Sequence, residues 1–502
     1  MPVETRPRPH RATGSSLAVV VATLSLLAGC TPSVVPTVSP SATVTPRQFT
    51  LLTTGPMTTA DPAVATGDTD SMLVTSVYQR LMVVLPETGE LKPDAATDCL
   101  FTSKLVYECT LPELLSFHNG HVLDSSDVRF SLQRALRMNA AGTSIPLLAA
   151  LSKIEIPDAR TIRFRLSWAD NQFGYALAGQ AASIVDEEVF DPDGPLPLLT
   201  LPIGSGPYTV RTVEAEQASF AKFEKYVGPK AGLLDELKLS IAADSVAAEA
   251  AIAEGTVDVV WRSLDNAALQ RVTDEIAGSS DRRTATGFSR FSLPGIRVTR
   301  VIWNPAARLR RNADLRLGVA RALQPDRTLD SLVPLGVAEH ATAFARGGRA
   351  RLPKLSGDRI ILTLGYSPTS PGHADLANLL RGRIEGLDGV SVRLVTSGVA
   401  DLWLTDTPAW VNNATGWLQH YLDGPLTDSA AKLAALDQRS RTTSGVARTV
   451  ALTELQQQAA VDNTVLPVTQ ADGMLFVAKG VTLIGQPFGS GQTLGFWGFT
   501  HG

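Results

Sequence analysis

Tryptophan and polar residues concentrate near the end of the chain, in a pattern that could contact a small molecule. Trp403, Trp410 and Trp417 recur every seven residues and are three of the seven tryptophans. Asp406 and His420 lie in the same span. Aromatic faces beside a few polar groups are typical of ligand pockets. The tryptophans could equally form a hydrophobic core, which is the simpler interpretation, because Pro408 excludes one continuous helix through them.

The histidines do not form a catalytic or metal-binding motif. All seven are scattered, and the sequence contains neither a His-Glu-x-x-His pattern nor a Gly-x-Ser-x-Gly elbow. His118 and His121 could bind a metal, but a solvated loop is the simpler setting for them. The glycines of Pro202–Tyr208 lack the spacing of a dinucleotide loop, and no Gly-Lys-Ser/Thr follows. The sequence therefore predicts a protein that is not an enzyme and holds no cofactor or metal.

Length and charge narrow the class further. A chain of 502 residues is too long for one core of usual size, so two or three domains are expected. Hydrophobic residues make up 44% and charged residues 19%, as in ordinary soluble proteins. The formal net charge of −4 argues against a nucleic-acid partner.

The N-terminus has the features of a targeting segment. Three arginines precede the mostly apolar run Leu17–Leu27, which is too short for a well-behaved membrane span. Leu27-Ala28-Gly29-Cys30 resembles the lipobox of a bacterial lipoprotein, so residues 1–29 are expected to be a signal peptide and Cys30 to carry the lipid. Residues 30–47 are rich in Pro, Ser and Thr and are typical of an extended tether. We therefore expect a protein anchored by lipid on the extracytoplasmic face of the plasma membrane; a plain signal peptide is the alternative.

Two cysteines remain once Cys30 is acylated. Outside the cell such a pair usually forms a disulfide, and Cys99 and Cys109 are spaced for the two strands of a hairpin. Closing so small a loop would stabilise the fold by about 3 kcal/mol in the chain-entropy model. Two free buried thiols are the alternative.

The stretch Tyr107–Met138 predicts a strand, a loop and a helix. Asp124 can accept from the amides of the first helical turn, and Asp127 can reach back as in a capping box. One face of the helix is apolar and faces a core. Other strands are predicted at 49–53, 161–166, 234–241 and 465–468, and a βαβ unit at 360–395 with its helix at 374–384.

This stretch resembles the signature of the bacterial extracellular solute-binding proteins, family 5, which serve peptide and nickel ABC importers. The residues that match it are Leu111, Phe117, Gly120, Asp127, Val128, Ser131 and Leu132. Further matches follow in the family's order, among them Asp61 to Leu81, the Pro-Ile-Gly-Ser-Gly-Pro-Tyr run 202–208 and the return strand at 465–468. The resemblance covers about Phe49 to Val481.

The resemblance implies an α/β fold of the two-lobed, periplasmic-binding-protein-like kind (type II, cluster C) with an inserted subdomain. Lobe I would comprise residues 48–91, 201–295 and 471–502. The inserted subdomain would span 92–200, and lobe II 296–470. The lobes would trap a peptide or a similar small solute between them and deliver it to an ABC permease with its ATPase. The resemblance also implies a monomer.

The resemblance also suggests where the solute would bind. Thr66, Gly67 and Asp68 occupy a loop that lies near the ligand in the family, where Asp68 could attract a cation or be solvated. Peptide-binding relatives hold the ligand's amino group with an aspartate in a Gly-Trp-x-x-Asp-Tyr motif. This chain has His420 at that position, which argues against capture of a peptide by its amino end. His420 could still face the cleft or be a structural histidine, and Asp406 could contact the ligand or be solvated.

A second interpretation remains open. A solute-binding fold without an attached importer could act as a regulator or scaffold of cell-envelope processes. The missing aspartate at position 420 favours this, as does the turn around Tyr226, which lacks the family's Asn and Trp.

Overall fold

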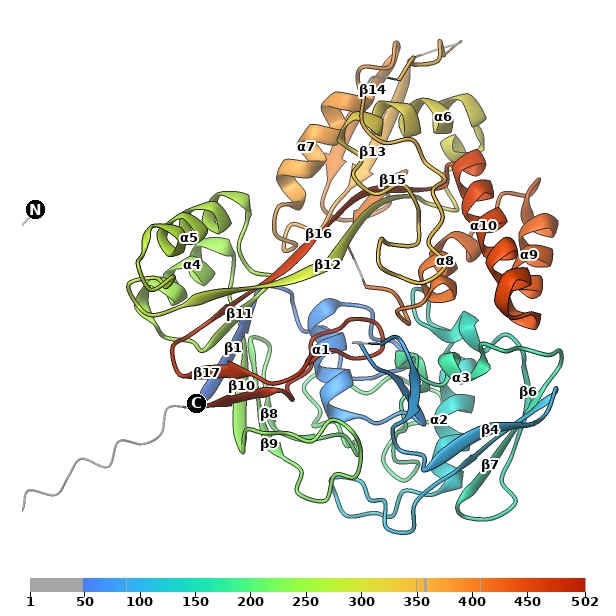
Figure 1. Cartoon of the computed structure of the whole chain (residues 1–502), viewed down its shortest axis with the longest axis vertical. Coiled ribbons are helices and arrows are strands. Elements are labelled where there is room, and N and C mark those ends of the chain that lie inside the picture. The colour runs from blue at the N-terminus through green and yellow to red at the C-terminus, as the bar shows by residue number, and fades with distance from the viewer. Residues whose placement is uncertain (1–47, 87, 349, 356–358, 407, 502) are drawn as a thin grey trace, which may run out of the picture. The chain divides into compact units, whose positions relative to one another are not determined.

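One mixed sheet of ten strands runs through the protein, in the order β14-β13-β15-β12-β16-β11-β1-β10-β9-β8 (Figure 1). The computed structural model describes residues 48–501 except 87, 349, 356–358 and 407. The expected signal peptide, the lipid site Cys30 and the tether all lie outside the described residues.

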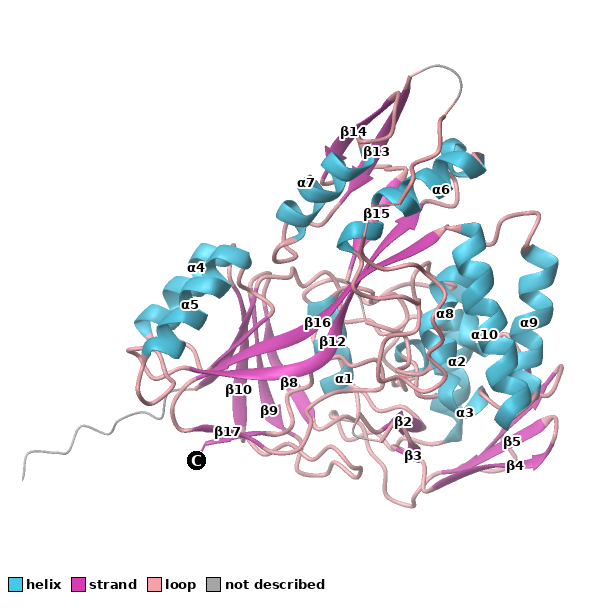
Figure 2. Ribbon diagram, turned by 45° about the horizontal axis from the view of Figure 1, so that its top comes forward, coloured by secondary structure: helices cyan, strands magenta, loops and turns pink. Residues whose placement is uncertain are grey.

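Two long antiparallel strands, β12 (Ser289–Trp303) and β16 (Val465–Val477), connect the two bodies of the structure. They cross from one body to the other in both views (Figures 1 and 2). Their register shifts between Leu293 and Arg297, where Gly295 has a φ of 66°. The side-chain amide of Gln470 donates to the Gly295 carbonyl at 2.9 Å. We call the body on the β1 side lobe I and the body on the β15 side lobe II.

Lobe I is built on the strands at one end of the sheet. Strand β1 lies between β10 and β11 and runs parallel to both, whereas β8, β9 and β10 pair antiparallel. Helix α1 packs in one core of this lobe, and α4 and α5 pack in the other (Figure 1). The elements of lobe I are β1 (Phe49–Thr53), α1 (Asp68–Val77), β2 (Met82–Val84), β3 (Leu91–Pro93), β8 (Tyr208–Val213), β9 (Gln217–Lys222), β10 (Glu236–Ile241), α4 (Ser245–Glu254), β11 (Val259–Trp261), α5 (Asn266–Gly278), β17 (Val481–Leu483) and β18 (Phe499–His501).

The glycines of the 202–208 run allow two segments of lobe I to approach closely. A Cβ on Gly204 would lie 2.1 Å from the Val77 carbonyl oxygen, and one on Gly206 would lie 2.7 Å from the same atom. The Gly206 amide donates to that carbonyl at 2.8 Å, so residues 202–208 pack directly against the C-terminal end of α1. These glycines therefore allow a backbone path that a Cβ would block.

A second sheet, β4-β5-β7-β6, carries the inserted subdomain against α2. The predicted capping box is confirmed, because Asp124 accepts from the helix amides and Asp127 accepts from the Asp124 amide at 3.0 Å. Cys99 and Cys109 are directly opposite on β4 and β5 and form a disulfide. The elements here are β4 (Asp98–Ser103), β5 (Val106–Thr110), α2 (Ser125–Met138), η1 (Ile145–Leu148), β6 (Leu151–Glu155), β7 (Thr161–Leu166), α3 (Phe173–Ala176) and η2 (Gln180–Ala182).

Lobe II contains the predicted βαβ unit and a group of helices beside it (Figure 2). The predicted strand at 360–365 agrees with β13, and the helix predicted at 374–384 begins one residue earlier. The elements are η3 (Arg308–Arg311), α6 (Ala313–Ala322), η4 (Gln324–Asp326), β13 (Ile360–Gly365), α7 (His373–Ile384), β14 (Val390–Val395), β15 (Leu402–Thr405), α8 (Ala414–Leu422), α9 (Ala430–Thr442) and α10 (Gly445–Asp462). Among the described helices, none is both long and apolar enough to span a bilayer.

Candidate functional site

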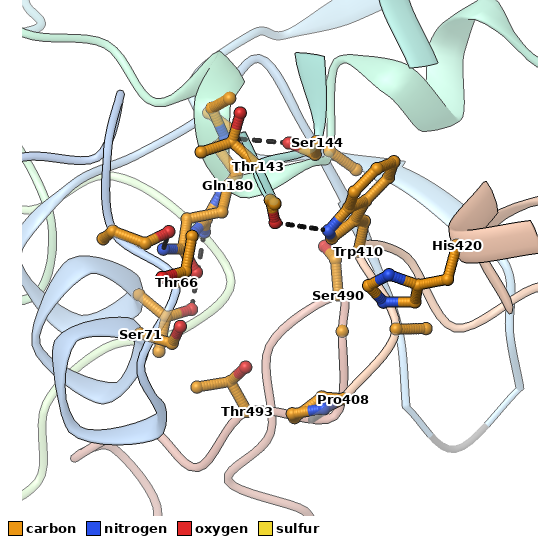
Figure 3. Close-up of a pocket in the computed structure, with 18 residues that line it drawn as sticks. Thr66, Ser71, Thr143, Ser144, Gln180, Pro408, Trp410, His420, Ser490 and Thr493 are labelled. Atoms are coloured by element: carbon orange, nitrogen blue, oxygen red, sulfur yellow. Dashed lines mark hydrogen bonds between the residues drawn. The ribbon is translucent and has the colours of Figure 1, made fainter. Parts of the chain in front are cut away.

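A cavity of about 230 Å³ lies between the lobes and takes its walls from four parts of the chain (Figure 3). We call it the cleft cavity. Lobe I supplies the residues around α1, the inserted subdomain a second wall, lobe II a third, and the C-terminal segment a fourth. The lining residues are Ala65, Thr66, Ser71, Thr75, Arg80, Gly142, Thr143, Ser144, Ala178, Gln180, Ala181, Pro408, Ala409, Trp410, His420, Ser490, Gly491 and Thr493.

The C-terminal segment ties these walls together. The Ser490 hydroxyl accepts from the Val84 amide of lobe I at 3.0 Å. The Ser490 carbonyl accepts from the Asn412 amide of lobe II at 2.7 Å. At Gly491 a Cβ would lie 2.3 Å from the Ala409 carbonyl oxygen, so the two backbones touch there. The segment therefore contacts both lobes at the edge of the cavity.

Trp410 and His420 form the wall from lobe II and lie opposite Thr66 and Ser71 (Figure 3). Their ring centroids are 5.2 Å apart, and the Trp410 indole N–H donates to the Gly142 carbonyl at 2.9 Å. Burial, together with the nearby Arg300 cation, lowers the pKa of His420 to about 3. His420 is therefore a neutral imidazole at pH 7, and it offers an ammonium group no anionic partner.

The other two tryptophans lie outside this cavity. Trp417 is 1% exposed in the core of lobe II, and its indole N–H donates to the Asn412 side-chain oxygen at 2.9 Å. The Arg300 guanidinium lies 5.2 Å from the Trp417 ring centroid. Trp403 is half-buried on β15 and packs against Gly365. The Trp417 ring thus has the environment of a core residue, while Trp410 has that of a cavity wall.

A second cavity, of about 250 Å³, adjoins the α1 N-terminus and contains Gly67, Asp68 and Asp406 in its lining. Asp406 is 6% exposed and is not solvated. The Arg262 guanidinium bonds to Asp406 of lobe II and, through its other nitrogen, to Asp68 of lobe I at 2.6 Å. Arg297 and His373 reach the Asp406 carboxylate at 3.1 and 3.2 Å.

The neighbouring side chains keep Asp406 ionised. Burial alone would raise the pKa of Asp406, but Arg262, His373 and Arg297 outweigh it and hold the pKa of Asp406 well below its usual value. The Asp68 pKa is raised by burial and by the Asp406 charge, against the opposing effect of Arg262. The two carboxylates are therefore committed to an ion-pair network that joins the lobes.

A second ion pair joins the lobes on the side of the inserted subdomain. Arg441, at the end of α9, bonds to Asp170 at 2.5 Å, and both side chains are at most 2% exposed. The same guanidinium donates to the Leu147 carbonyl at 2.7 Å. Truncating one partner of such a buried pair leaves an unpaired charge and is strongly destabilising.

The predicted site residues therefore fall into three groups. Thr66, Trp410 and His420 share the cleft cavity; Gly67, Asp68 and Asp406 share the second cavity; Trp403 and Trp417 line neither. Sequence reasoning missed the remaining lining residues, most of which are small or hydroxylated. Of these residues, Arg80 stands out in the sequence, because it is a charged residue within the largely apolar run that ends in β2.

The histidines of the loop before α2 are engaged within the fold. His118 bonds to the Gly206 carbonyl at 3.0 Å, and His121 bonds to the Asp186 carboxylate at 2.8 Å. Across the described residues, no cluster of three or more His, Cys, Asp or Glu side chains could hold a metal ion.

The two-lobed mixed α/β fold with a cavity between its lobes defines the class of periplasmic solute-binding proteins. The chain is similar to the binding protein AgaA from A. tumefaciens R10, solved with agropinic acid, at a TM-score of 0.75 and 17% identity over 91% of this chain and 98% of that one. It is also similar to DppA from Helicobacter pylori, solved with the peptide STSA, at a TM-score of 0.76 and 15% identity over 90% and 98%. The predicted fold class is confirmed.

A family model gives the particular group. Residues 90–348 match the model of the bacterial extracellular solute-binding proteins, family 5. The chain belongs to this family, and the resemblance drawn from its motifs is confirmed.

Curated relatives match over a shorter stretch. The HTH-type transcriptional regulators SgrR of Salmonella choleraesuis (strain SC-B67) and Salmonella typhi are each 29% identical over 189 residues, which is 38% of this chain and 32% of the regulator. The chain thus matches about a third of the length of these relatives.

Proposed function

We propose that the protein captures a peptide or similar small solute between its lobes and delivers it to an ABC permease with its ATPase. The observation that carries the proposal is the cleft cavity, whose walls come from lobe I, the inserted subdomain, lobe II and the C-terminal segment. A solute in that position contacts both lobes at once, so its binding energy favours the closed state over the open one. The solute-binding family and the similarity to solved peptide-binding structures support this assignment.

In the proposed closure, the two lobes rotate about β12 and β16. We take lobe I as residues 48–91, 201–295 and 471–502, the inserted subdomain as 92–200 and lobe II as 296–470. The limits at 295 and 470 are supported by the register shift near Gly295 and by its bond to Gln470. Hinges are a few residues at loops or element ends that absorb backbone rotation, and a glycine at positive φ suits such a place.

A binding screen tests the capture function. Thermal unfolding of the full chain in detergent is followed against di- to pentapeptides, opines, sugars, organic acids and nickel chelates. A solute present at about 100 times its dissociation constant should stabilise the protein by about 2.7 kcal/mol. The same solute should reduce the radius of gyration in small-angle scattering. A flat screen contradicts capture.

We further propose that Cys30 carries a lipid that holds the protein on the extracytoplasmic face of the membrane as a monomer. The description of the family as extracellular supports the location, and the motif at Leu27–Cys30 supports the anchor. Cys30→Ala should move the protein from the membrane fraction to the soluble fraction and should abolish incorporation of a labelled fatty acid. Retention of the variant in the membrane contradicts the anchor.

A role in regulation is the second candidate, and the match to transcriptional regulators over 189 residues favours it. The two functions differ in what the loaded protein contacts. An importer component should co-purify with a permease and stimulate its ATPase when the solute is present. Binding of a solute without either effect would favour the regulatory function.

A further inference from the structure

Arg80 brings a buried positive charge to the wall of the cleft cavity. It follows α1 within a run, Val77–Val84, in which every residue is buried, and it is itself 3% exposed. Its Nη1 donates to the Thr75 hydroxyl over a long 3.4 Å. Its Nε, also buried, has no hydrogen-bond partner among the described residues. The guanidinium therefore has donor capacity left over at the wall of a cavity that Thr75 also lines.

The charges around Arg80 do not balance. Asp94 is 5% exposed and lies near it, but Lys230 also depends on this carboxylate, with its Nζ 3.6 Å from Asp94. Burial lowers the pKa of both Arg80 and Lys230, and Asp94 opposes the effect in each case. Two buried cations thus share one carboxylate, and the surplus positive charge adjoins the cavity. A buried charge destabilises the protein unless a group of opposite charge pairs with it.

The remaining walls suit an anion and not an ammonium group. Among the described residues that line the cavity, none is acidic. Hydroxyl groups dominate the polar part of the lining, and Figure 3 shows Thr66, Ser71, Ser144, Ser490 and Thr493 around the central space. A hydroxyl can donate to an anionic oxygen, whereas an ammonium group would find no carboxylate here.

We propose that the cleft cavity recognises a small solute by an anionic group, a carboxylate or a phosphate, which pairs with Arg80. The inference rests on the proposed capture function and specifies its solute class. Arginine suits this role because its planar fork can make two parallel hydrogen bonds to either oxyanion. A volume of about 230 Å³ equals that of about eight water molecules in the liquid, so the solute is nearer a dipeptide than an extended oligopeptide in size.

Blocked dipeptides separate the two charges that a peptide carries. N-acetyl-dialanine has a carboxylate and no ammonium group, and dialanine amide has the ammonium group and no carboxylate. Titration calorimetry on the full chain in detergent should detect N-acetyl-dialanine and should not detect dialanine amide. Inorganic phosphate forms a third arm, and whichever of phosphate and N-acetyl-dialanine binds more tightly identifies the type of oxyanion. Binding of dialanine amide, or absence of binding by both anions at millimolar concentration, overturns the inference.

Substitutions assign the effect to Arg80. Arg80→Met keeps the length of the side chain and removes its charge, and it should weaken binding of the anion about 10- to 100-fold, as expected for a hydrogen bond to a charged group. Arg80→Lys should recover part of the affinity. The control is Arg271→Met on the surface of lobe I, which removes a cation that does not line the cavity, and it should bind as the natural protein does. Melting curves of each variant identify loss of the fold, and Arg80→Lys decides the matter if Arg80→Met does not fold.

The inference and the proposed function fail in different ways. A flat response to the whole solute screen overturns capture itself. A solute that binds Arg80→Met or Arg80→Lys as tightly as it binds the natural protein, or that carries only a positive charge, overturns the anionic class alone.

Discussion

Arg262 and Asp406, which are 144 residues apart in the chain, join lobe I to lobe II through a hydrogen-bonded ion pair. The same guanidinium also holds Asp68 at the start of α1. The lobes are thus connected by charge beside the second cavity, in addition to the two strands that cross between them. We expect the strength of this contact to influence how readily the cleft opens.

Arg262→Ala should therefore shift the protein toward an open state. The substitution leaves Asp68 without this cation and Asp406 with only Arg297 and His373, and truncating a buried pair costs about 3 kcal/mol or more. We expect a larger radius of gyration in solution and a lower midpoint of urea unfolding. Arg271→Ala is the matched control, because its ion pair with Glu249 lies on the surface of lobe I, where such pairs contribute about 0–1 kcal/mol. Equal effects of the two substitutions would contradict a connecting role for Arg262.

Arg441→Ala tests the second contact between the lobes. It leaves the Asp170 carboxylate buried without its cation and removes the bond to the Leu147 carbonyl. Hydrogen exchange should increase around α9 and around Asp170 of the inserted subdomain, while the strands of lobe I keep their protection. Exchange that stays unchanged near Asp170 would show that the contact does not hold the lobes.

Two buried histidines should make stability depend on pH. Burial lowers the pKa of His118 to about 4 and that of His420 to about 3, from an ordinary value of 6.5. As the pH falls below 6.5, the unfolded chain binds protons on both imidazoles before the folded chain does, so the free energy of unfolding decreases. Each histidine contributes a slope of at most about 1.4 kcal/mol per pH unit, which ends near pH 4 for His118 and near pH 3 for His420.

Urea unfolding between about pH 7 and about pH 5 measures this slope. His420→Asn removes one titrating group and should flatten the dependence. His501→Gln, on β18 at the surface, is the control and should leave it unchanged. A slope that is the same in all three proteins would assign the effect to other groups.

The disulfide should stabilise the inserted subdomain. Cys99 and Cys109 are separated by 10 positions, and opening so small a loop should cost about 3 kcal/mol in the chain-entropy model. A reducing agent, or replacement of both cysteines by serine, should speed hydrogen exchange in β4 and β5 first. The double variant should no longer respond to the reducing agent. Equal exchange with and without reductant in the natural protein would contradict this stabilisation.

Trp410 and Trp417 should respond in opposite ways to truncation. Trp417→Ala removes a side chain from the lobe II core and should cost about 3–5 kcal/mol of stability. Trp410→Ala removes part of the cavity wall and should weaken solute binding while costing less stability, because the side chain is only half-buried. The measurements are urea unfolding and titration with the solute found by the screen. Loss of binding in Trp417→Ala without loss of stability would reverse these assignments.

Local chemistry made much of the fold predictable from the sequence. The strands predicted at 49–53 and 161–166 agree with β1 and β7. Apolar residues alternate in β7, whereas β1 is a short strand that is buried throughout. Asp124 and Asp127 marked the start of α2, because the free amides of a helix terminus are hydrogen-bonded by side chains that are close in sequence. Gly255 ends α4 in the left-handed conformation with a φ of 66°, which is typical of a glycine that follows a helix.

Elements that depend on distant partners were predicted only in part. The strand predicted at 465–468 extends to Val477. Asp472-Gly473 has the sequence of a turn, but Gly473 pairs with Leu293 of β12 and continues the strand. Helix α10 spans Gly445–Asp462 with only a weak amphipathic pattern, so its extent depends on packing against α8 and α9.

The site was least predictable, because it is assembled from remote segments. In the sequence Asp406 could belong to a solvated turn. The fold brings Arg262, Arg297 and His373 to its carboxylate from remote segments. Sequence alone also does not reveal that an arginine becomes buried, and neither Arg80 nor Arg262 was foreseen. Thr66, Trp410 and His420 line one cavity, and motif resemblance, not periodicity, pointed to Thr66 and His420.

The position of β1 in the sheet has a consequence for biosynthesis. The first strand that the structure describes pairs with β10 and β11, which follow it by nearly two hundred residues or more, and β11 in turn pairs with β16 close to the end of the chain. Contacts between such remote segments form slowly. The sheet of lobe I therefore stays incomplete until the ribosome has made almost the whole polypeptide, so this lobe is expected to fold after its synthesis and not during it.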